Sequence, residues 1–355
     1  ANTTADYNTA VGRSALSASN TDSNSAFGAY ALRDNSTGNQ NTAIGAFAVR
    51  DTTTASNNTG VGYAALVVNT TGADNVAIGA GALDANTTAS ENVAVGKDAL
   101  TDNTTGTSNT AVGRMALGNN TTANGNTAVG TDSLFTNTTG SENTALGHSS
   151  MFANTTGSYN VAVGDSALDA NTTANNNTAV GYVALGGNTT GSENTAIGAF
   201  ALDANTTASN NTGVGYNALT GNTTGDSNSS LGTFALQSST TGDNNCAFGR
   251  SALQNNTTAA NNSAFGKDAL KVNTTGAYNT AVGSAALDAN TTGANNSALG
   301  YGALGANTTS SGNTAVGANA ADALTTGTQN VALGLEAMGG TTTGGYNTAV
   351  GGYTL

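Results

Sequence analysis

The side chains most able to do chemistry in this chain are one histidine, one cysteine and scattered carboxylates. His148 follows a recurring glycine, in a slot that holds Arg13, Tyr63 or Lys97 in other repeats. A slot that tolerates such different residues indicates a solvent-facing position and not a catalytic or metal-binding one. Cys246 stands where other repeats have Thr, Ser or Val, which favours a small packed side chain over a reactive thiol.

The carboxylates do not form a catalytic pattern either. One slot, directly after a leucine, holds Asp84, Asp169, Asp203 and Asp288. They form neither a carboxylate pair for acid–base work nor a calcium-binding repeat. Glycine pairs such as Gly60 and Gly62 lack the lysine and the strand-to-helix context of a phosphate loop. We therefore predict no enzyme activity, no catalytic residue, no metal site and no cofactor.

Two further features could carry a modification or a ligand. At the Asn-Thr-Thr turn, an Asn-x-Thr sequence recurs in fifteen repeats from Asn35 through Asn307, and another stands at Asn2. We expect it on an exposed turn, which makes N-glycosylation geometrically feasible. The alternative is turn chemistry alone, with asparagine supplying a left-handed residue. The candidate glycosylation sites are Asn69, Asn86, Asn103 and Asn171.

Tyrosines occupy outward slots, as at Tyr63, Tyr182, Tyr216 and Tyr301. Exposed aromatic side chains can contact a carbohydrate or a protein ligand. Along the sequence these tyrosines are too sporadic to define a site.

All of these residues are placed by one internal repeat. A glycine recurs at intervals of 17 residues, after a first step of 16, from Gly12 to Gly351, which gives 21 occurrences. The consensus is Asn-Thr-Ala-Val-Gly-x-x-Ala-Leu-x-x-Asn-Thr-Thr-Gly-x-x, and the asparagine four residues before the glycine is present every time. The period predicts a single repeat array over residues 1–355.

The repeat unit predicts a short β coil. Asn, Thr and Gly disfavour helix interiors, whereas Thr and Val suit a strand. We expect one strand at the Thr-Ala-Val segment and a second at the Ala-Leu segment, with a positive-φ corner at the glycine. The Asn-Thr-Thr-Gly run supplies the second turn. Stacked coils predict an all-β fold, a parallel β-solenoid of about 21 coils.

Identical residues of successive coils should form ladders. We expect asparagine side chains to hydrogen-bond along the axis, and the valine and leucine ladders to form a thin core. A one-residue slip would turn the valines outward, which fixes the register. Representative ladder residues are Asn75, Val76, Ile78, Gly79, Leu83, Asn92, Val95, Gly96, Leu100, Asn109, Val112, Gly113 and Leu117.

Composition limits the partners. Gly accounts for 48 residues, Pro and Trp are absent, and only 8% of residues are charged. The chain has only 8 Lys and Arg and a net charge of −13. It therefore lacks the basic surface with which proteins bind nucleic acid or an anionic membrane. No apolar run is long enough for a spanning helix.

The thin core predicts self-association. We expect the small alanine rows to lie on the surface and to let another chain approach closely, which favours a symmetric homo-oligomer. Because neither end shows a capping repeat, we also expect the array to continue into other domains.

The repeat resembles a known family. The segment from Asn109 to Leu117, like Asn75-Val76-Ala77-Ile78-Gly79, is similar to the head repeat of trimeric autotransporter adhesins. The resemblance covers the whole chain and implies a left-handed parallel β-roll, a homotrimer, an extracellular location and binding to host-surface protein or carbohydrate. The unit is longer than the usual adhesin repeat, and the extra residues fall in the Asn-Thr-Thr turn. Phage and bacterial fibre repeats look similar.

Three functional hypotheses remain. The first is a non-catalytic extracellular fibre module, structural or adhesive, from a bacterial surface adhesin head or shaft. The second, an alternative form of the first, is a phage or injection-system tail fibre. The third is an ice-binding β-solenoid with threonine ladders, although Thr70 and Thr71 are adjacent and should point to opposite sides.

Overall fold

The computed structural model describes residues 5–355, and these fold as the repeat predicts. The chain is an all-β parallel β-solenoid with one coil per 17-residue repeat, about 21 coils in all. Asn2 and its sequon lie outside the described residues. The part of the chain from residue 5 onward contains no helix that could cross a membrane.

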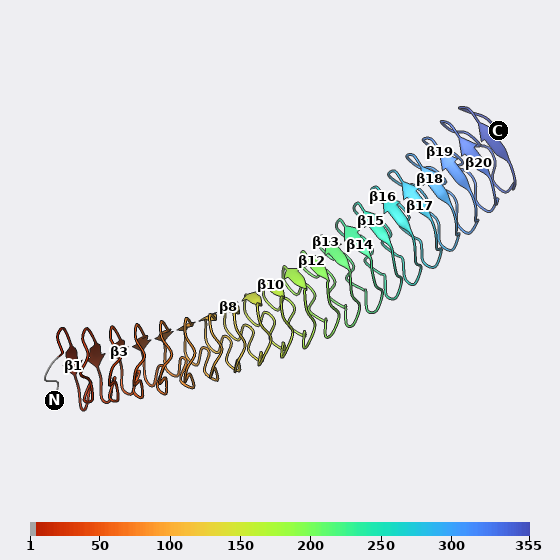
Figure 1. Ribbon diagram of the computed structural model, residues 1–355. Helices are drawn as coiled ribbons and strands as arrows, with labels where there is room; N and C mark the ends of the chain where they lie inside the picture. Colours follow the sequence, from red (N-terminus) through yellow and green to blue (C-terminus); the bar gives the residue numbers. More distant parts are fainter. Residues whose placement is uncertain (1–4) are drawn as a thin grey trace. The chain divides into compact units, whose positions relative to one another are not determined.

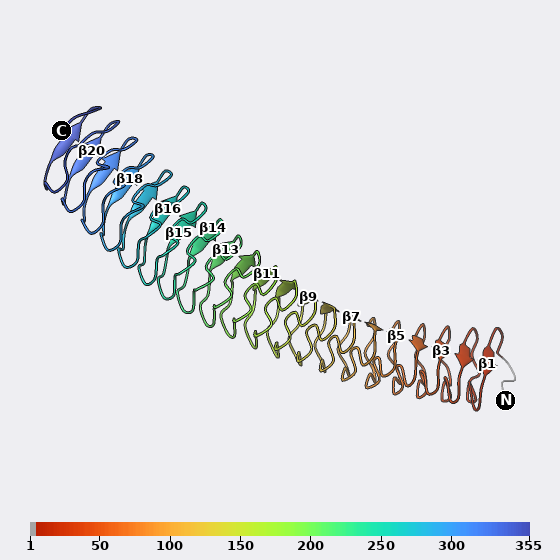
Figure 2. The same cartoon turned by 180° about the vertical axis from the view of Figure 1, so that it is seen from behind.

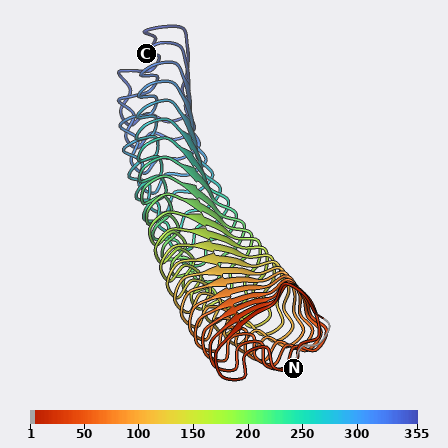
Figure 3. The same ribbon diagram turned by 90° about the vertical axis from the view of Figure 1, so that its left-hand side faces the viewer.

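Contacts group the coils into two compact units. The first ends at Asn176, and the second runs from Asn177 to Leu355. Within each unit every strand lies beside the strand of the next coil (Figures 1 and 2). Figure 3 shows the coils closer to end-on, with corresponding segments stacked on one another.

Every strand is three residues long and has the same place in its coil. The first unit contains β1 (Thr9–Val11), β2 (Ser25–Phe27), β3 (Thr42–Ile44), β4 (Thr59–Val61), β5 (Val76–Ile78), β6 (Val93–Val95), β7 (Thr110–Val112), β8 (Thr127–Val129), β9 (Thr144–Leu146) and β10 (Val161–Val163). The second contains β11 (Thr178–Val180), β12 (Thr195–Ile197), β13 (Thr212–Val214), β14 (Ser229–Leu231), β15 (Cys246–Phe248), β16 (Ser263–Phe265), β17 (Thr280–Val282), β18 (Ser297–Leu299), β19 (Thr314–Val316), β20 (Val331–Leu333) and β21 (Thr348–Val350).

The strands pair in parallel and in the register that the repeat dictates. Ile78 lies opposite Val95, and Val95 lies opposite Val112. The repeat glycine ends each strand with a φ between +117° and +145°, a conformation that side chains rarely adopt. The predicted glycine corner and the predicted ladders are therefore both confirmed.

The predicted second strand is wrong. The Ala-Leu segment is a turn in every described coil, and its leucine has left-handed backbone, with φ of 53° at Leu66. The segment still bonds to the next coil, because the Leu66 amide donates to the Ala82 carbonyl at 2.9 Å. A residue in this conformation costs roughly 1–2 kcal/mol, which the cross-coil hydrogen bond and the burial of the leucine offset.

The expected core of valine and leucine rows is also wrong, because only the leucine row is buried. The leucine row is buried in every coil before the last, but the row that faces it is alanine, as at Ala77 and Leu83. The residue directly before each repeat glycine points outward, and Ile78 remains 40% exposed. The alanine rows are thus interior, so they cannot be the surface on which another chain approaches.

The narrow interior of the coil explains why the small residue, and not the bulky one, is buried opposite the leucine. At Gly60, which stands in the alanine row, an added Cβ would already meet the side chain of Val49 in the leucine row of the preceding coil. At Gly213 the corresponding distance to Leu202 is 3.3 Å. The interior therefore has room for a leucine opposite a methyl group, and a second bulky row has to lie outside.

A buried asparagine row completes the interior, and its side chains make the hydrogen bonds along the axis that the sequence predicted. Asn109 is fully buried, and its backbone amide donates to the Asn92 Oδ1 at 2.9 Å. The Asn92 Nδ2 donates in turn to the Gly106 carbonyl at 3.0 Å. Each side chain thus joins its own coil to the neighbouring ones and gives the buried backbone amide of the next asparagine its acceptor.

Candidate functional site

The candidate reactive residues lie apart from one another. His148 is exposed, and its Nδ1 lies 3.5 Å from the Asp165 carboxylate on the next coil. Cys246 begins β15 and is half-buried, and this burial raises the pKa of its thiol. From residue 5 onward, no three His, Cys, Asp or Glu side chains come together as metal ligands.

The four aspartates of the shared slot are half-buried. Asp84 accepts a hydrogen bond from the Thr101 hydroxyl at 2.7 Å. Burial raises the pKa of the Asp203 and Asp288 carboxyls. The four aspartates belong to separate coils, and none of them lines either of the two hollows described below.

The asparagines of the recurring sequon are not on an exposed turn, so that prediction is wrong. Asn69, Asn86, Asn103 and Asn171 are all fully buried. The Asn69 Nδ2 donates to the Gly72 carbonyl at 2.7 Å, and the Gly72 amide donates back to the Asn69 Oδ1 at 3.1 Å. The side chain closes the turn in place of a left-handed residue, and the folded coil does not present its amide to a glycosylating enzyme.

One long apolar surface does face solvent. We name it the outer sheet face: the first and third residues of every strand, which share one side because side chains alternate along a strand. The third residue is always Val, Ile, Leu or Phe and is never buried in the described chain. Its most exposed members away from the first and last coils include Ile44, Leu146, Leu231 and Leu299, each at 44% or more.

The outer sheet face carries no charge in either unit. Its first row contains only Thr, Ser, Val and one Cys, although the chain as a whole has a net charge of −13. Monomeric proteins rarely expose contiguous apolar patches of more than a few hundred Å². A strip of this composition along ten strands in the first unit and eleven in the second therefore indicates an interaction surface.

The tyrosines are less scattered than the sequence suggested. In the first unit, Tyr30 stacks on Phe47 at 5.3 Å between ring centroids, and Phe47 meets Tyr63 edge-on at 5.8 Å. The guanidinium of Arg13 lies 5.3 Å from the Tyr30 centroid. Because the faces of Tyr30 are taken by its own neighbours, this cluster is internally satisfied.

The second unit has a longer aromatic run, which we name the aromatic ladder: Tyr182, Phe200, Tyr216 and Phe234, one ring from each of four successive coils. Consecutive ring centroids are 5.3, 6.2 and 5.7 Å apart. Sequence reasoning missed it because the rings alternate between two slots, one and two residues after the glycine. The signal was present as a Tyr in one slot followed by a Phe in the other slot of the next repeat.

A row of threonines occupies a third surface. The residue nine positions after the repeat glycine is an exposed Thr in every coil of the first unit from Thr37 to Thr173, and of the second from Thr190 to Thr343. The preceding threonines are half-buried, and their hydroxyls bind the next coil, as when the Thr70 Oγ1 donates to the Thr87 carbonyl at 3.0 Å. Only one row thus keeps free hydroxyls.

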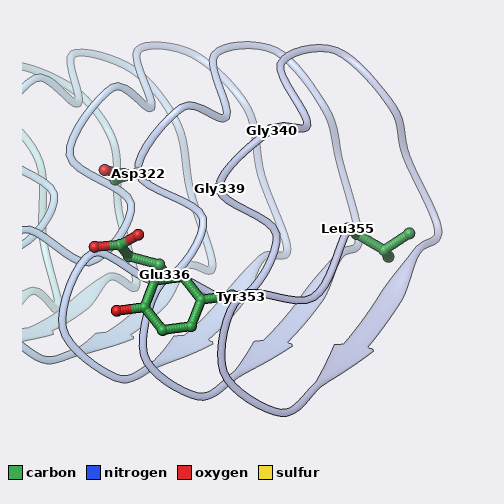
Figure 4. Close-up of a pocket in the computed structure, with 6 residues that line it drawn as sticks. All are labelled: Asp322, Glu336, Gly339, Gly340, Tyr353 and Leu355. Carbon is green, nitrogen blue, oxygen red and sulfur yellow. The ribbon is translucent and has the colours of Figure 1, made fainter.

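Hollows in the described chain are shallow. The last coil has one of about 320 Å³ beside Asp322, Glu336 and Tyr353 (Figure 4). A second, of about 480 Å³, lies beside Tyr346 and Gln329. Neither contains the combination of buried polar groups and enclosure that marks a small-molecule site.

No protein-family model matches the sequence, and a search of curated proteins finds no significant match.

Proposed function

We propose that this chain is a non-catalytic, extracellular fibre module, structural and adhesive, that assembles with copies of itself through the outer sheet face. One observation carries the proposal: a charge-free row of Val, Ile, Leu and Phe is exposed or half-exposed, and never buried, along all the strands of both units. The same unit is repeated without a coil that breaks the pattern, which favours a fibre over an enzyme.

A second copy of the chain fits this surface better than an unrelated protein does. The bulky side chains recur at the spacing of parallel strands, roughly 4.8 Å. A partner with the same coil spacing can place a side chain between two of these at every step, so the fit persists along a whole unit. Two acidic chains would repel each other on most surfaces, but not on one without charge.

The number of copies in the proposal comes from the sequence. The resemblance to the head repeats of trimeric adhesins favours three chains around a common axis, each with its outer sheet face turned inward. Such an arrangement would serve a bacterial adhesin and a phage or injection-system fibre alike.

The solution mass tests the assembly. Light scattering at several concentrations should give about three times the chain mass of 34.3 kDa. Introducing Ile78→Asp, Val95→Asp and Val112→Asp together should release single chains with an unchanged circular dichroism spectrum. The substituted side chains lie outside the core, whereas aspartates buried between copies would cost several kcal/mol each.

The matched control places three aspartates elsewhere on the same coils. Thr88→Asp, Thr105→Asp and Thr122→Asp change the exposed threonine row by the same charge and should leave the mass unchanged. A single-chain mass for the wild type would contradict the proposal, and so would dissociation caused equally by both variants.

Ice binding is the second candidate, favoured by the uninterrupted threonine row. The free hydroxyls form a single line, because the neighbouring row donates to carbonyl groups. Thermal hysteresis of the purified chain measures this activity directly. If ice binding is correct, Thr71→Tyr with Thr88→Tyr should reduce the hysteresis several-fold, and the outer-face aspartates should not.

A further inference from the structure

We infer that the aromatic ladder of the second unit is a binding platform for an extended, neutral, β-linked glycan chain. This inference rests on the adhesive part of the proposed function and adds the chemical class of the ligand. The ladder lies one and two residues beyond the repeat glycine, whereas the outer sheet face lies before it. Ligand binding and self-association can therefore be tested separately.

The geometry of the ladder matches a linear polymer. Each ring plane is turned by 77° to 89° from that of the next ring. The tyrosines recur on alternate coils, with a phenylalanine on the coil between them. Two coil steps measure about 9.5 Å, twice the spacing of parallel strands. A disaccharide unit of an extended β-linked glycan has nearly the same length, so Tyr182 and Tyr216 can contact equivalent sugars of one chain.

The exposure of the rings suits sugar binding. Tyr182 is 54% exposed and Tyr216 is 47% exposed, and the phenylalanines between them are half-buried supports. An aromatic face is electron-rich, and the C–H groups on one side of a pyranose carry a small positive charge, so the two surfaces attract. The tyrosine hydroxyls add hydrogen-bonding groups at the rim of the platform.

Polar groups for the sugar hydroxyls lie beside the rings. Asp203, three residues after Phe200, makes no hydrogen bond or ion pair through its carboxylate in the described chain. The same slot of the preceding coil holds Gly186, which has no side chain to cover this carboxylate. A Cβ added at Gly186 would lie 3.1 Å from the Asp203 Oδ1. Asn217 follows Tyr216 and accepts a hydrogen bond from the Thr220 hydroxyl at 3.4 Å, which leaves its amide hydrogens for a ligand.

The aromatic cluster of the first unit does not form such a platform. There Tyr30 stacks nearly parallel to Phe47, at 8°, and Arg13 and Arg33 lie 5.3 and 5.9 Å from its centroid. Such a ring has no free face. In the ladder the rings meet edge to face, and from residue 177 onward no cation–π contact covers them.

The charge of the site selects a neutral ligand. Asp203 adds a negative charge to the coil of Phe200, and the chain carries a net charge of −13. An acidic polysaccharide would be repelled by both. Arg250, on the coil after Phe234, lies at the end of the ladder and can donate to the oxygen of a neutral sugar as well.

The test is calorimetric titration of the full chain with cellohexaose, xylohexaose and chitohexaose. We expect binding of at least one of them, and at least tenfold weaker binding by the variant Tyr182→Ala/Tyr216→Ala. Tyr301→Ala is the matched control, since Tyr301 occupies the same slot and is 64% exposed but has no ring partner in the described chain. Tyr182→Phe/Tyr216→Phe, which keeps the rings, should bind within threefold of the wild type.

Several results would overturn the inference: no binding of any of these hexasaccharides, equal losses in Tyr301→Ala and the double alanine variant, or binding only of oligogalacturonate or of a proline-rich peptide. The solution mass and circular dichroism of each variant are measured in parallel. A wild type that binds sugar as a single chain would refute the assembly and keep the platform, whereas a stable trimer without sugar binding would do the reverse.

Discussion

Gly79→Ala should destabilise its coil by roughly 3 kcal/mol or more. The added Cβ would lie 2.5 Å from the carbonyl carbon of Gly96 on the next coil, and the backbone φ is +142°. The unusual φ contributes about 1–3 kcal/mol, and the forced shift of a packed backbone contributes about as much again. Urea denaturation followed by circular dichroism should show a clear fall in the unfolding midpoint.

Gly81→Ala is the matched control in the same coil. Its φ is +67°, a value that Ala64 tolerates in the equivalent slot at +54°. The nearest atom to the new Cβ is the carboxylate oxygen of Asp98, the movable end of a side chain. We expect a loss of about 1 kcal/mol; equal losses for the two variants would contradict the role given to the glycine corner.

The second large effect concerns the asparagine row. Asn126→Ala should cost roughly 1–3 kcal/mol, because it leaves the Asn143 backbone amide buried without a partner. The Gly140 carbonyl loses one of its two donors and keeps the Asn137 Nδ2 at 2.8 Å. In the native chain these groups bond to the Asn126 side chain at 2.9 Å in both cases. Loss of protection from hydrogen exchange at the Asn143 amide would locate the effect.

Asn124→Ala is the control two residues away. Its Oδ1 accepts from the Thr107 amide at 2.7 Å, but the side chain is exposed and water can replace it. We expect a loss below about 1 kcal/mol. A loss as large as that of Asn126→Ala would show that burial does not govern these hydrogen bonds.

The opposite change should stabilise the second unit. Ser239 stands where most repeats have the turn asparagine, and the Asn222 Oδ1 of the preceding coil is buried without a hydrogen bond. Elsewhere the next turn asparagine donates to that oxygen, as Asn86 does to Asn69 at 3.0 Å. Ser239→Asn should therefore raise the stability by about 1–3 kcal/mol, and Thr241→Asn, on the exposed row, should not.

The periodicity allowed most of the architecture to be predicted. A 17-residue recurrence with an asparagine, a small residue and a glycine at constant positions permits one register only, because any slip would remove the buried asparagine from its partners. The ladders around Asn92, Gly96 and Leu100 follow directly from it. Reactive side chains vary from coil to coil, so the sequence also placed His148 outside.

The candidate surfaces were harder to predict. The tyrosines of the aromatic ladder are separated by a full repeat from the phenylalanines that they contact, and no single slot contains both. The sequons were misplaced for a related reason: asparagine and threonine are typical of exposed turns, but Asn69 hydrogen-bonds inside the coil. In both cases the neighbour that decides the environment belongs to another coil or lies across the turn.

The sequence by itself determined the period, the parallel register, the glycine corner and the asparagine row, since each follows from one residue type at one position. Only the tertiary structure decided which side of the strand lies inside. Hydrophobicity favours burying Val95, but the space beside Leu83 accommodates only the methyl group of Ala94. The small residue therefore enters the core, and the large one is left on the outer sheet face, where we propose that it meets another copy of the chain.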